Sequence, residues 1–170
     1  MTTITAIPTI YAGIQFRSRL EARWAVFMDA LGVKWEYEPE GFTDGTLCYL
    51  PDFWLPNQNC YLEIKPDGPW YEDCKKADLI THTGKEFYFA IGRPIRRDET
   101  SHGGSLMKWP DSAGCEEKLD FVVCGSCNLT AIVWLGLWDE MCCCSDAIAN
   151  REAHDAAVFA ANNHRFGKIA

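Results

Sequence analysis

The sequence predicts a mixed α/β fold, in which a small sheet is flanked by helices. Apolar residues recur at helical spacing over 18–31, where the first helix is expected. Two strand-like stretches, 47–55 and 60–65, are joined by a short turn rich in Pro and Asn. A second helical segment at 70–81 then leads to a further strand at 85–91. The chain therefore alternates between helices and strands in its first half.

The segments around these elements are less regular. Residues 1–12 are expected to be an irregular lead-in. Gly32 ends the first helix, and the strand that follows over 33–38 is broken by Pro39. The segment 94–118 is rich in Gly, Ser, Asp, Pro and Arg, which indicates a loop or linker.

We therefore expect three parts along the chain. A core occupies 1–93, the linker covers 94–118, and a cysteine-rich hairpin with a closing helix occupies 119–170 and packs on the core. Ser145 is the expected cap of the closing helix, which is predicted to run to about Asn163.

Composition limits the function. The chain has 170 residues, 48% of them hydrophobic, with 7 Trp and 9 Phe, which is enough for a packed core. The net charge of −8 argues against a tight, generic DNA-binding protein, because such binding depends on Lys and Arg. Carboxylates that a divalent cation neutralises would account for part of the excess.

Nothing in the sequence indicates a secreted or membrane protein. Residues 1–10 lack the basic start and apolar run of a signal peptide. The uncharged stretch 121–138 is interrupted by polar residues and has the composition of a buried hairpin. We therefore expect a cytoplasmic protein with no membrane span. In that setting nine cysteines indicate reduced thiols or metal ligands rather than disulfides.

A candidate site lies on the predicted strand pair. Because strand side chains alternate, Glu63 and Lys65 share one face and Ile64 points to the other. A turn at 56–59 folds the strand that carries Asp52 back against them. Two carboxylates and an ammonium then converge, as in sites that hold a hard cation and hydrolyse phosphodiesters. An ordinary surface salt bridge is the alternative.

Longer segments extend this pattern and resemble the PD-(D/E)xK nuclease superfamily, especially small nuclease-like proteins of phages and mobile elements. The segments are 16–25 (FRSRLEARWA), 35–40 (WEYEPE) and 49–53 (YLPDF). With the E-x-K motif and the glycine at position 92, the resemblance covers roughly residues 12–92. It implies a restriction-endonuclease-like core with the element order αβββαβ.

The resemblance also implies roles for individual residues. Asp52, Glu63 and the backbone carbonyl of Ile64 would ligate Mg²⁺ or Mn²⁺. Lys65 would orient or deprotonate the attacking water, or stabilise developing charge. Glu21 would complete the catalytic set from the first helix, often by contacting the metal through water. An ordinary helix carboxylate paired with a neighbour is the alternative for Glu21.

Basic residues near this site are candidates for nucleic-acid binding. Arg17, Arg19 and Arg23 are expected on one helix, where they would meet phosphates, although a solvated helix face explains them equally well. Glu38 is a candidate supporting carboxylate, with an ordinary carboxylate at a strand end as the alternative.

The cysteines form a second candidate site. Cys124 and Cys127 make a C-x-x-C pair in a Gly-containing turn, which suits tetrahedral zinc. Cys142 and Cys144 would point to one side of a strand and are the expected other ligands of a zinc knuckle. The alternates for these two positions are Cys115 and Cys143. Reduced cysteines in a core are the competing interpretation.

These features predict a metal-dependent DNA nuclease that uses Mg²⁺ or Mn²⁺ and carries a structural Zn²⁺. DNA is the expected partner, with a homodimer or a host or phage protein as further partners. The alternative is a catalytically silent protein of the same fold that binds nucleic acid or a host protein. A zinc protein that binds its partner through the C-terminal half is a third interpretation, supported by the cysteines alone.

Overall fold

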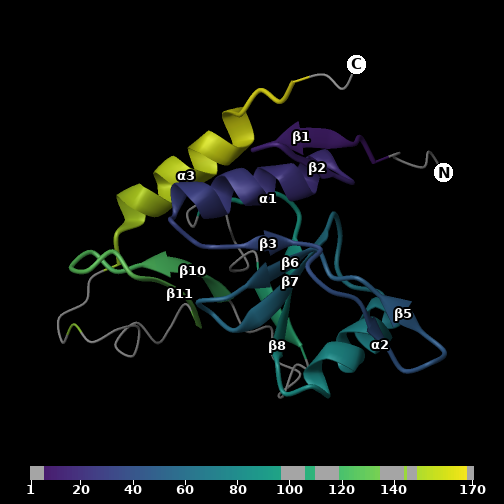
Figure 1. The fold of residues 1–170 in the computed structure, drawn as a ribbon. Helices are drawn as coiled ribbons and strands as arrows, with labels where there is room; N and C mark the ends of the chain where they lie inside the picture. Colours follow the sequence, from purple (N-terminus) through teal and green to yellow (C-terminus); the bar gives the residue numbers. More distant parts are fainter. Residues whose placement is uncertain (1–5, 97–105, 110–118, 135–143, 145–148, 168–170) are drawn as a thin grey trace.

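The computed structural model describes residues 6–96, 106–109, 119–134, 144 and 149–167. Within these ranges a seven-stranded mixed sheet and three helices form a mixed α/β fold, as the sequence predicts (Figure 1). The sheet has the strand order β11-β10-β9-β8-β7-β6-β3. Its strands are β3 (Glu36–Tyr37), β6 (Phe53–Leu55), β7 (Cys60–Lys65), β8 (Glu86–Ile91), β9 (Leu106–Trp109), β10 (Leu119–Val123) and β11 (Thr130–Trp134).

The sheet lies between two layers. Helices α1 (Arg19–Ala30) and α3 (Arg151–Asn163) pack side by side over one face (Figure 1). Helix α2 (Tyr71–Thr81) covers the other face and connects β7 to β8, which run parallel. A two-stranded ribbon of β4 (Phe42–Thr43) and β5 (Cys48–Tyr49) lies beside α2.

Strand β7 is buried on both faces because both layers cover it. Leu62 and Ile64 belong to the apolar cluster with α1, whereas Tyr61 belongs to the cluster with α2. The predicted alternation is therefore confirmed, and Glu63 and Lys65 lie on the α2 face. The hairpin from β6 to β7 also forms as predicted, with Phe53 opposite Leu62 in an antiparallel register.

Helix α1 begins and ends close to the predicted positions. Ser18 is its N-cap, and the Ser18 hydroxyl oxygen accepts the Glu21 N–H at 3.2 Å. Gly32 follows the helix with φ +68°, a left-handed conformation that favours glycine. Trp24 is fully buried, and its Nε1–H donates to the Gly92 carbonyl at 2.9 Å. This bond fixes α1 to the end of β8.

Three predictions about the first half of the chain are wrong in part. The lead-in contains β1 (Thr9–Tyr11), which forms a hairpin with β2 (Ile14–Phe16). The strand expected over 33–38 is only the two-residue β3. The strand expected over 47–55 is interrupted between β5 and β6, where Pro51 has no N–H to donate to a ladder.

Two predictions about the second half also fail. The expected linker contains β9, which pairs antiparallel with β8 and extends the sheet. The closing helix begins at Arg151, with Asn150 as its cap, because the Asn150 side chain accepts the Ala153 N–H at 3.0 Å. Ala149 forms a β-bridge with Cys124, which excludes a helix running from Ser145 through this point. Ser145 itself lies outside the described residues.

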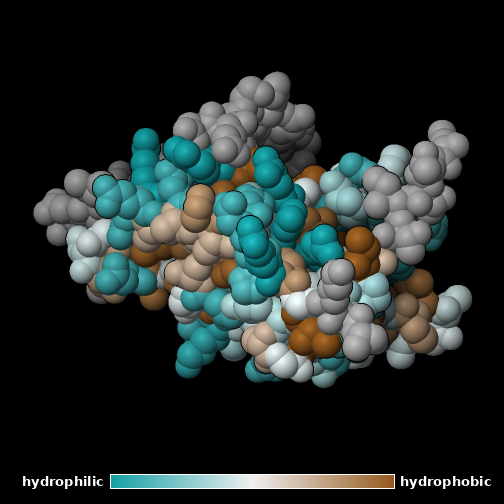
Figure 2. All heavy atoms as spheres, turned by 90° about the horizontal axis from the view of Figure 1, so that it is seen from above, coloured by the Kyte–Doolittle hydropathy of each residue, from teal (hydrophilic) through white to brown (hydrophobic). Residues whose placement is uncertain are grey.

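The outer face of the α1 and α3 layer is mixed in character. Figure 2 shows hydrophilic residues over much of it, with apolar residues scattered among them. Among the described helices, none has the length and apolar character needed to cross a bilayer.

Candidate functional site

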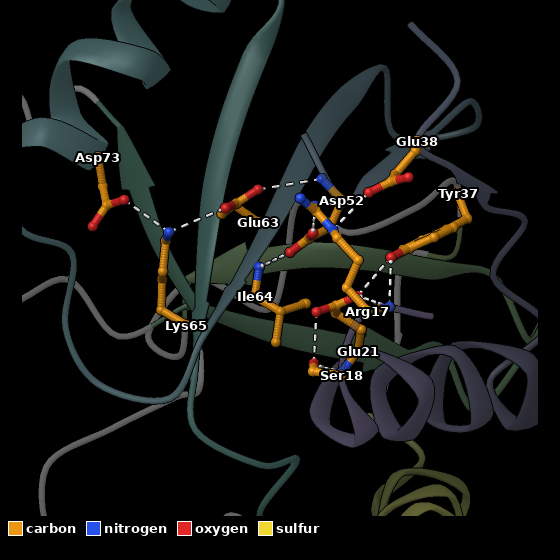
Figure 3. Close-up of polar contacts among 10 residues, drawn as sticks. All are labelled: Arg17, Ser18, Glu21, Tyr37, Glu38, Asp52, Glu63, Ile64, Lys65 and Asp73. Carbon is orange, nitrogen blue, oxygen red and sulfur yellow. Dashed lines mark hydrogen bonds and ion pairs between the residues drawn. The ribbon is translucent and has the colours of Figure 1, made fainter. Parts of the chain in front are cut away.

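An acidic cluster lies where β7 ends, between the first turns of α1 and α2 (Figure 3). Asp52 is 3% exposed and Glu63 is 7% exposed, so both carboxylates are buried. The Ile64 N–H donates to Asp52 Oδ2 at 2.8 Å, and the Asp52 N–H donates to Glu63 Oε2 at 3.2 Å. Each carboxylate is thus fixed by a backbone amide beside its partner, and the structure brings the two together as the spacing predicts.

Lys65 lies at the edge of this cluster. Its Nζ is 3.1 Å from Glu63 Oε1 and 2.7 Å from Asp73 Oδ1. Burial lowers the pKa of Lys65, but its hydrogen bond to Asp73 and the charge of Glu63 outweigh burial, so the net pKa is raised. Lys65 is therefore an ammonium in this arrangement, suited to orienting water or stabilising negative charge rather than removing a proton.

Asp73 also belongs to this cluster, although no sequence pattern predicted its contact with Lys65. It lies in the first turn of α2, and its Oδ2 accepts the Trp70 N–H at 2.9 Å. Burial raises the pKa of Asp73, but the bonds from Lys65 and Trp70 outweigh it, and the net pKa is lowered. An acidic residue three positions after a helix cap is a recognisable signal, but it indicates capping and not contact with Lys65.

Glu21 lies nearby, but its carboxylate already accepts hydrogen bonds from neighbouring residues. It is buried, and its carboxylate accepts the Ser18 hydroxyl at 2.6 Å, the Tyr37 hydroxyl at 2.6 Å and the Arg17 N–H at 3.1 Å. Among the described residues, no three carboxylate oxygens from different side chains lie within 4.8 Å of one another. Glu21 is therefore placed beside the pair of Asp52 and Glu63, not in a single three-carboxylate shell with them.

Arg17 joins the cluster, whereas the other two predicted arginines do not. Arg17 precedes the cap Ser18, so it is not part of α1; its Nη2 lies 2.7 Å from Asp52 Oδ1. Its Nε lies 2.7 Å from Glu38 Oε1, so Glu38 acts on the site through Arg17. Arg19 is exposed and borders a hollow near the N-terminal hairpin, and Arg23 is partly buried along α1.

The cluster holds more negative than positive charge. Burial raises the pKa of Asp52, and the charges of Glu63 and Glu21 raise it further. The hydrogen bond from the Ile64 N–H and the charge of Arg17 lower it. The net pKa of Asp52 is nevertheless well above its usual range. Tyr49 is also buried here, and burial, the charge of Glu63 and its hydrogen bond to Glu63 raise the Tyr49 pKa. Such an excess of buried oxygen charge is the environment that a divalent cation relieves.

A separate cysteine cluster lies at the opposite part of the sheet. The sulfur atoms of Cys124, Cys127 and Cys144 lie within 4.8 Å of one another, so they are close enough to hold one metal ion. The Ser126 N–H donates to Cys124 Sγ at 3.4 Å, which is a backbone contact that stabilises a thiolate. The predicted ligand Cys142 and both alternates, Cys115 and Cys143, lie outside the described residues.

The turn between β10 and β11 explains how two of these cysteines meet. The Asn128 N–H donates to the Cys124 carbonyl at 2.9 Å, and Asn128 has φ +58°. This closes a tight turn with Cys127 inside it. The β-bridge between Cys124 and Ala149 then brings the chain before α3 to the same place.

The chain matches no protein-family model, no curated protein and no solved structure. The geometry of these two clusters and the sequence motifs that form them are therefore the features that bear on its function.

Proposed function

We propose that this chain is a DNA nuclease that hydrolyses phosphodiester bonds with Mg²⁺ or Mn²⁺ at the site of Asp52, Glu63 and Lys65. One observation carries the proposal: two buried carboxylates, each bonded to backbone beside the other, lie next to an ammonium at the end of β7. The resemblance to PD-(D/E)xK nucleases assigns the same three residues to catalysis.

The donor set fits a hard cation. Asp52 and Glu63 offer carboxylate oxygens, and the carbonyl of Ile64 lies on the strand between Glu63 and Lys65. A bound divalent cation polarises a phosphate oxygen and lowers the pKa of a bound water. The raised pKa of Asp52 supports the proposal, because burial and the charges of Glu63 and Glu21 leave its carboxylate poorly compensated.

The other residues of the site would position the reactants. Lys65 would direct its ammonium at the water or at the phosphate oxygen that gains charge. Asp73 would hold that ammonium in place, since it bonds Lys65 at 2.7 Å. Glu21 would act at the rim, where it also fixes the loop that carries Arg17.

Zinc is the ion we propose for the cysteine cluster, with Cys142 as the fourth ligand beside Cys124, Cys127 and Cys144. Thiolates in a tight turn of the C-x-x-C type form structural zinc sites. The cluster joins the β10–β11 turn to the segment before α3, so its role would be to hold these two elements together.

A silent binding protein on the same scaffold is the second candidate. It is favoured by the placement of Glu21, which is satisfied by Ser18, Tyr37 and Arg17 and so is not poised to ligate a metal directly. Such a protein would bind nucleic acid or a host or phage protein without cutting.

Cleavage assays separate the two candidates. The protein would be incubated with supercoiled, linear and single-stranded DNA, with Mg²⁺, with Mn²⁺ or with EDTA. The nuclease proposal expects cleavage that needs the metal and is lost in Glu63→Gln but kept in Glu72→Gln, an exposed carboxylate on α2. Binding without cleavage of any substrate would favour the silent protein.

A further inference from the structure

The Arg17 side chain is bonded to a carboxylate oxygen of the proposed cation site. Asp52 Oδ2 already accepts the Ile64 N–H at 2.8 Å, which is a fixed backbone donor. Asp52 Oδ1 is bonded to Arg17 Nη2 at 2.7 Å. Both oxygens of Asp52 therefore accept a hydrogen bond. The donor to Oδ2 is a backbone amide, whereas the donor to Oδ1 is a side chain.

Hydrogen bonds hold the backbone of Arg17 in place, whereas its side chain is exposed to solvent. Its N–H donates to Glu21 and to the Tyr37 hydroxyl, each at 3.1 Å, so the position of the main chain is fixed. The side chain is 54% exposed. A guanidinium in that position can rotate away from Asp52 without any change in the fold.

Glu38 offers Arg17 a second carboxylate. Glu38 Oε1 lies 2.7 Å from Arg17 Nε, and the Glu38 N–H donates to the Asp52 carbonyl at 2.9 Å. Glu38 also has φ +47°, an uncommon backbone conformation for a residue with a side chain. The backbone is therefore strained at Glu38, the position that places the Glu38 carboxylate close to Asp52.

We infer that Arg17 is an exchangeable counter-ion, which neutralises Asp52 until a divalent cation binds and then turns its guanidinium to a phosphate of the DNA strand. Guanidinium and metal compete for Asp52 Oδ1, since both neutralise the same oxygen. Glu38 keeps Arg17 beside the site after the exchange, and a guanidinium presents the planar fork that binds phosphate. The inference rests on the proposed metal site.

Mn²⁺ binding without DNA tests the exchange. Free Mn²⁺ would be measured by electron paramagnetic resonance during titration of the wild type, Arg17→Gln, Arg17→Lys, Arg19→Gln and Asp52→Asn. We expect Arg17→Gln to bind about tenfold more tightly than the wild type, because a competing charge-assisted bond is lost. Arg17→Lys should fall between them, Arg19→Gln should match the wild type, and Asp52→Asn should lose the site.

The phosphate contact is tested separately at saturating Mn²⁺, where Arg17→Gln should raise the KM for DNA about tenfold. Equal Mn²⁺ affinity in the wild type, Arg17→Gln and Arg17→Lys, with loss in Asp52→Asn, would overturn the exchange and leave the metal site standing. Absence of Mn²⁺ binding in the wild type and both Arg17 variants would overturn the exchange and the metal site together. An unchanged KM in Arg17→Gln would overturn the contact with phosphate.

Discussion

The Lys65 ammonium and the Asp73 carboxylate lie 2.7 Å apart, and this contact joins the end of β7 to the first turn of α2. The same carboxylate accepts the Trp70 N–H, so the group that caps the helix also fixes the ammonium. The position of Lys65 therefore depends on where α2 begins, although the two residues belong to different elements.

Asp73→Asn should separate these two roles. The amide oxygen can still accept the Trp70 N–H, so α2 should keep its cap, but the charge that holds Lys65 is lost. We expect kcat for DNA cleavage to fall about tenfold to a hundredfold with little change in KM. Steady-state kinetics would measure this, with Glu72→Gln as the matched control on the same turn. A kcat equal to that of the control would show that Asp73 only caps the helix.

Asp52→Asn and Glu63→Gln should abolish metal-dependent cleavage, with a fall of at least about a hundredfold, while the protein stays folded. Each change removes one buried negative charge that faces another, so the melting temperature without metal should not fall. Mg²⁺ should raise the melting temperature of the wild type and of neither variant. Thermal melts and cleavage assays would be compared side by side, and wild-type cleavage by both variants would refute the assignment.

Freshly purified, reduced protein should contain about one zinc ion per chain, as a four-ligand structural site requires. Cys127→Ser should lose this ion, because it removes one sulfur of the cluster. Hydrogen exchange should then speed up in β10, β11 and α3 more than in β7 and β8. Elemental analysis and exchange mass spectrometry would measure both effects.

Cys48→Ser is the control for the zinc prediction, because Cys48 is an exposed thiol on β5 outside the cluster. It should keep the zinc and the exchange pattern of the wild type. Wild-type protein without zinc would refute the zinc site.

Cys60 should make the protein less stable at alkaline pH. Burial raises the pKa of the Cys60 thiol to about 12, from an ordinary value of 9.0. The unfolded chain loses this proton from about pH 9 and the folded protein keeps it to about pH 12, so the free energy of unfolding falls as pH rises through that window.

Within this window Cys60 lowers the free energy of unfolding by up to about 1.4 kcal/mol for each unit rise in pH. Urea unfolding at pH 8 and pH 10 would measure it, and the decrease should be smaller in Cys60→Ala than in Cys48→Ala. Equal decreases in the two variants would mean that the buried thiol does not contribute.

The parts of the site that depend on local rules were predictable. Strand alternation alone places Glu63 and Lys65 on one face and Ile64 on the other, and the structure confirms it. The cap at Ser18 is equally local, because its hydroxyl meets an N–H three residues on. The turn that holds Cys124 and Cys127 follows from their spacing in the same way.

The rest depends on how separate elements pack. The bond between Lys65 and Asp73 requires α2 to begin beside the end of β7, which no local pattern specifies. Arg17 was expected to face DNA from a helix, but the hairpin of β1 and β2 ends just before it and turns its side chain to Asp52. Strand β9 was missed because its four residues lie in a segment whose composition is that of a loop.

Strand β9 also determines whether a shortened form of this protein would fold with a covered sheet edge. It pairs with β8 on one side and with β10 on the other, so the strands that carry the proposed metal site and the cysteine turn belong to one hydrogen-bonded sheet. A fragment ending after residue 93 would leave the backbone of β8 without its neighbour and uncover Phe87 and Phe89 beside it. Such an open, aromatic edge favours self-association. A fragment that keeps only residues 1–93 would therefore aggregate, even though it contains every residue of the proposed metal site.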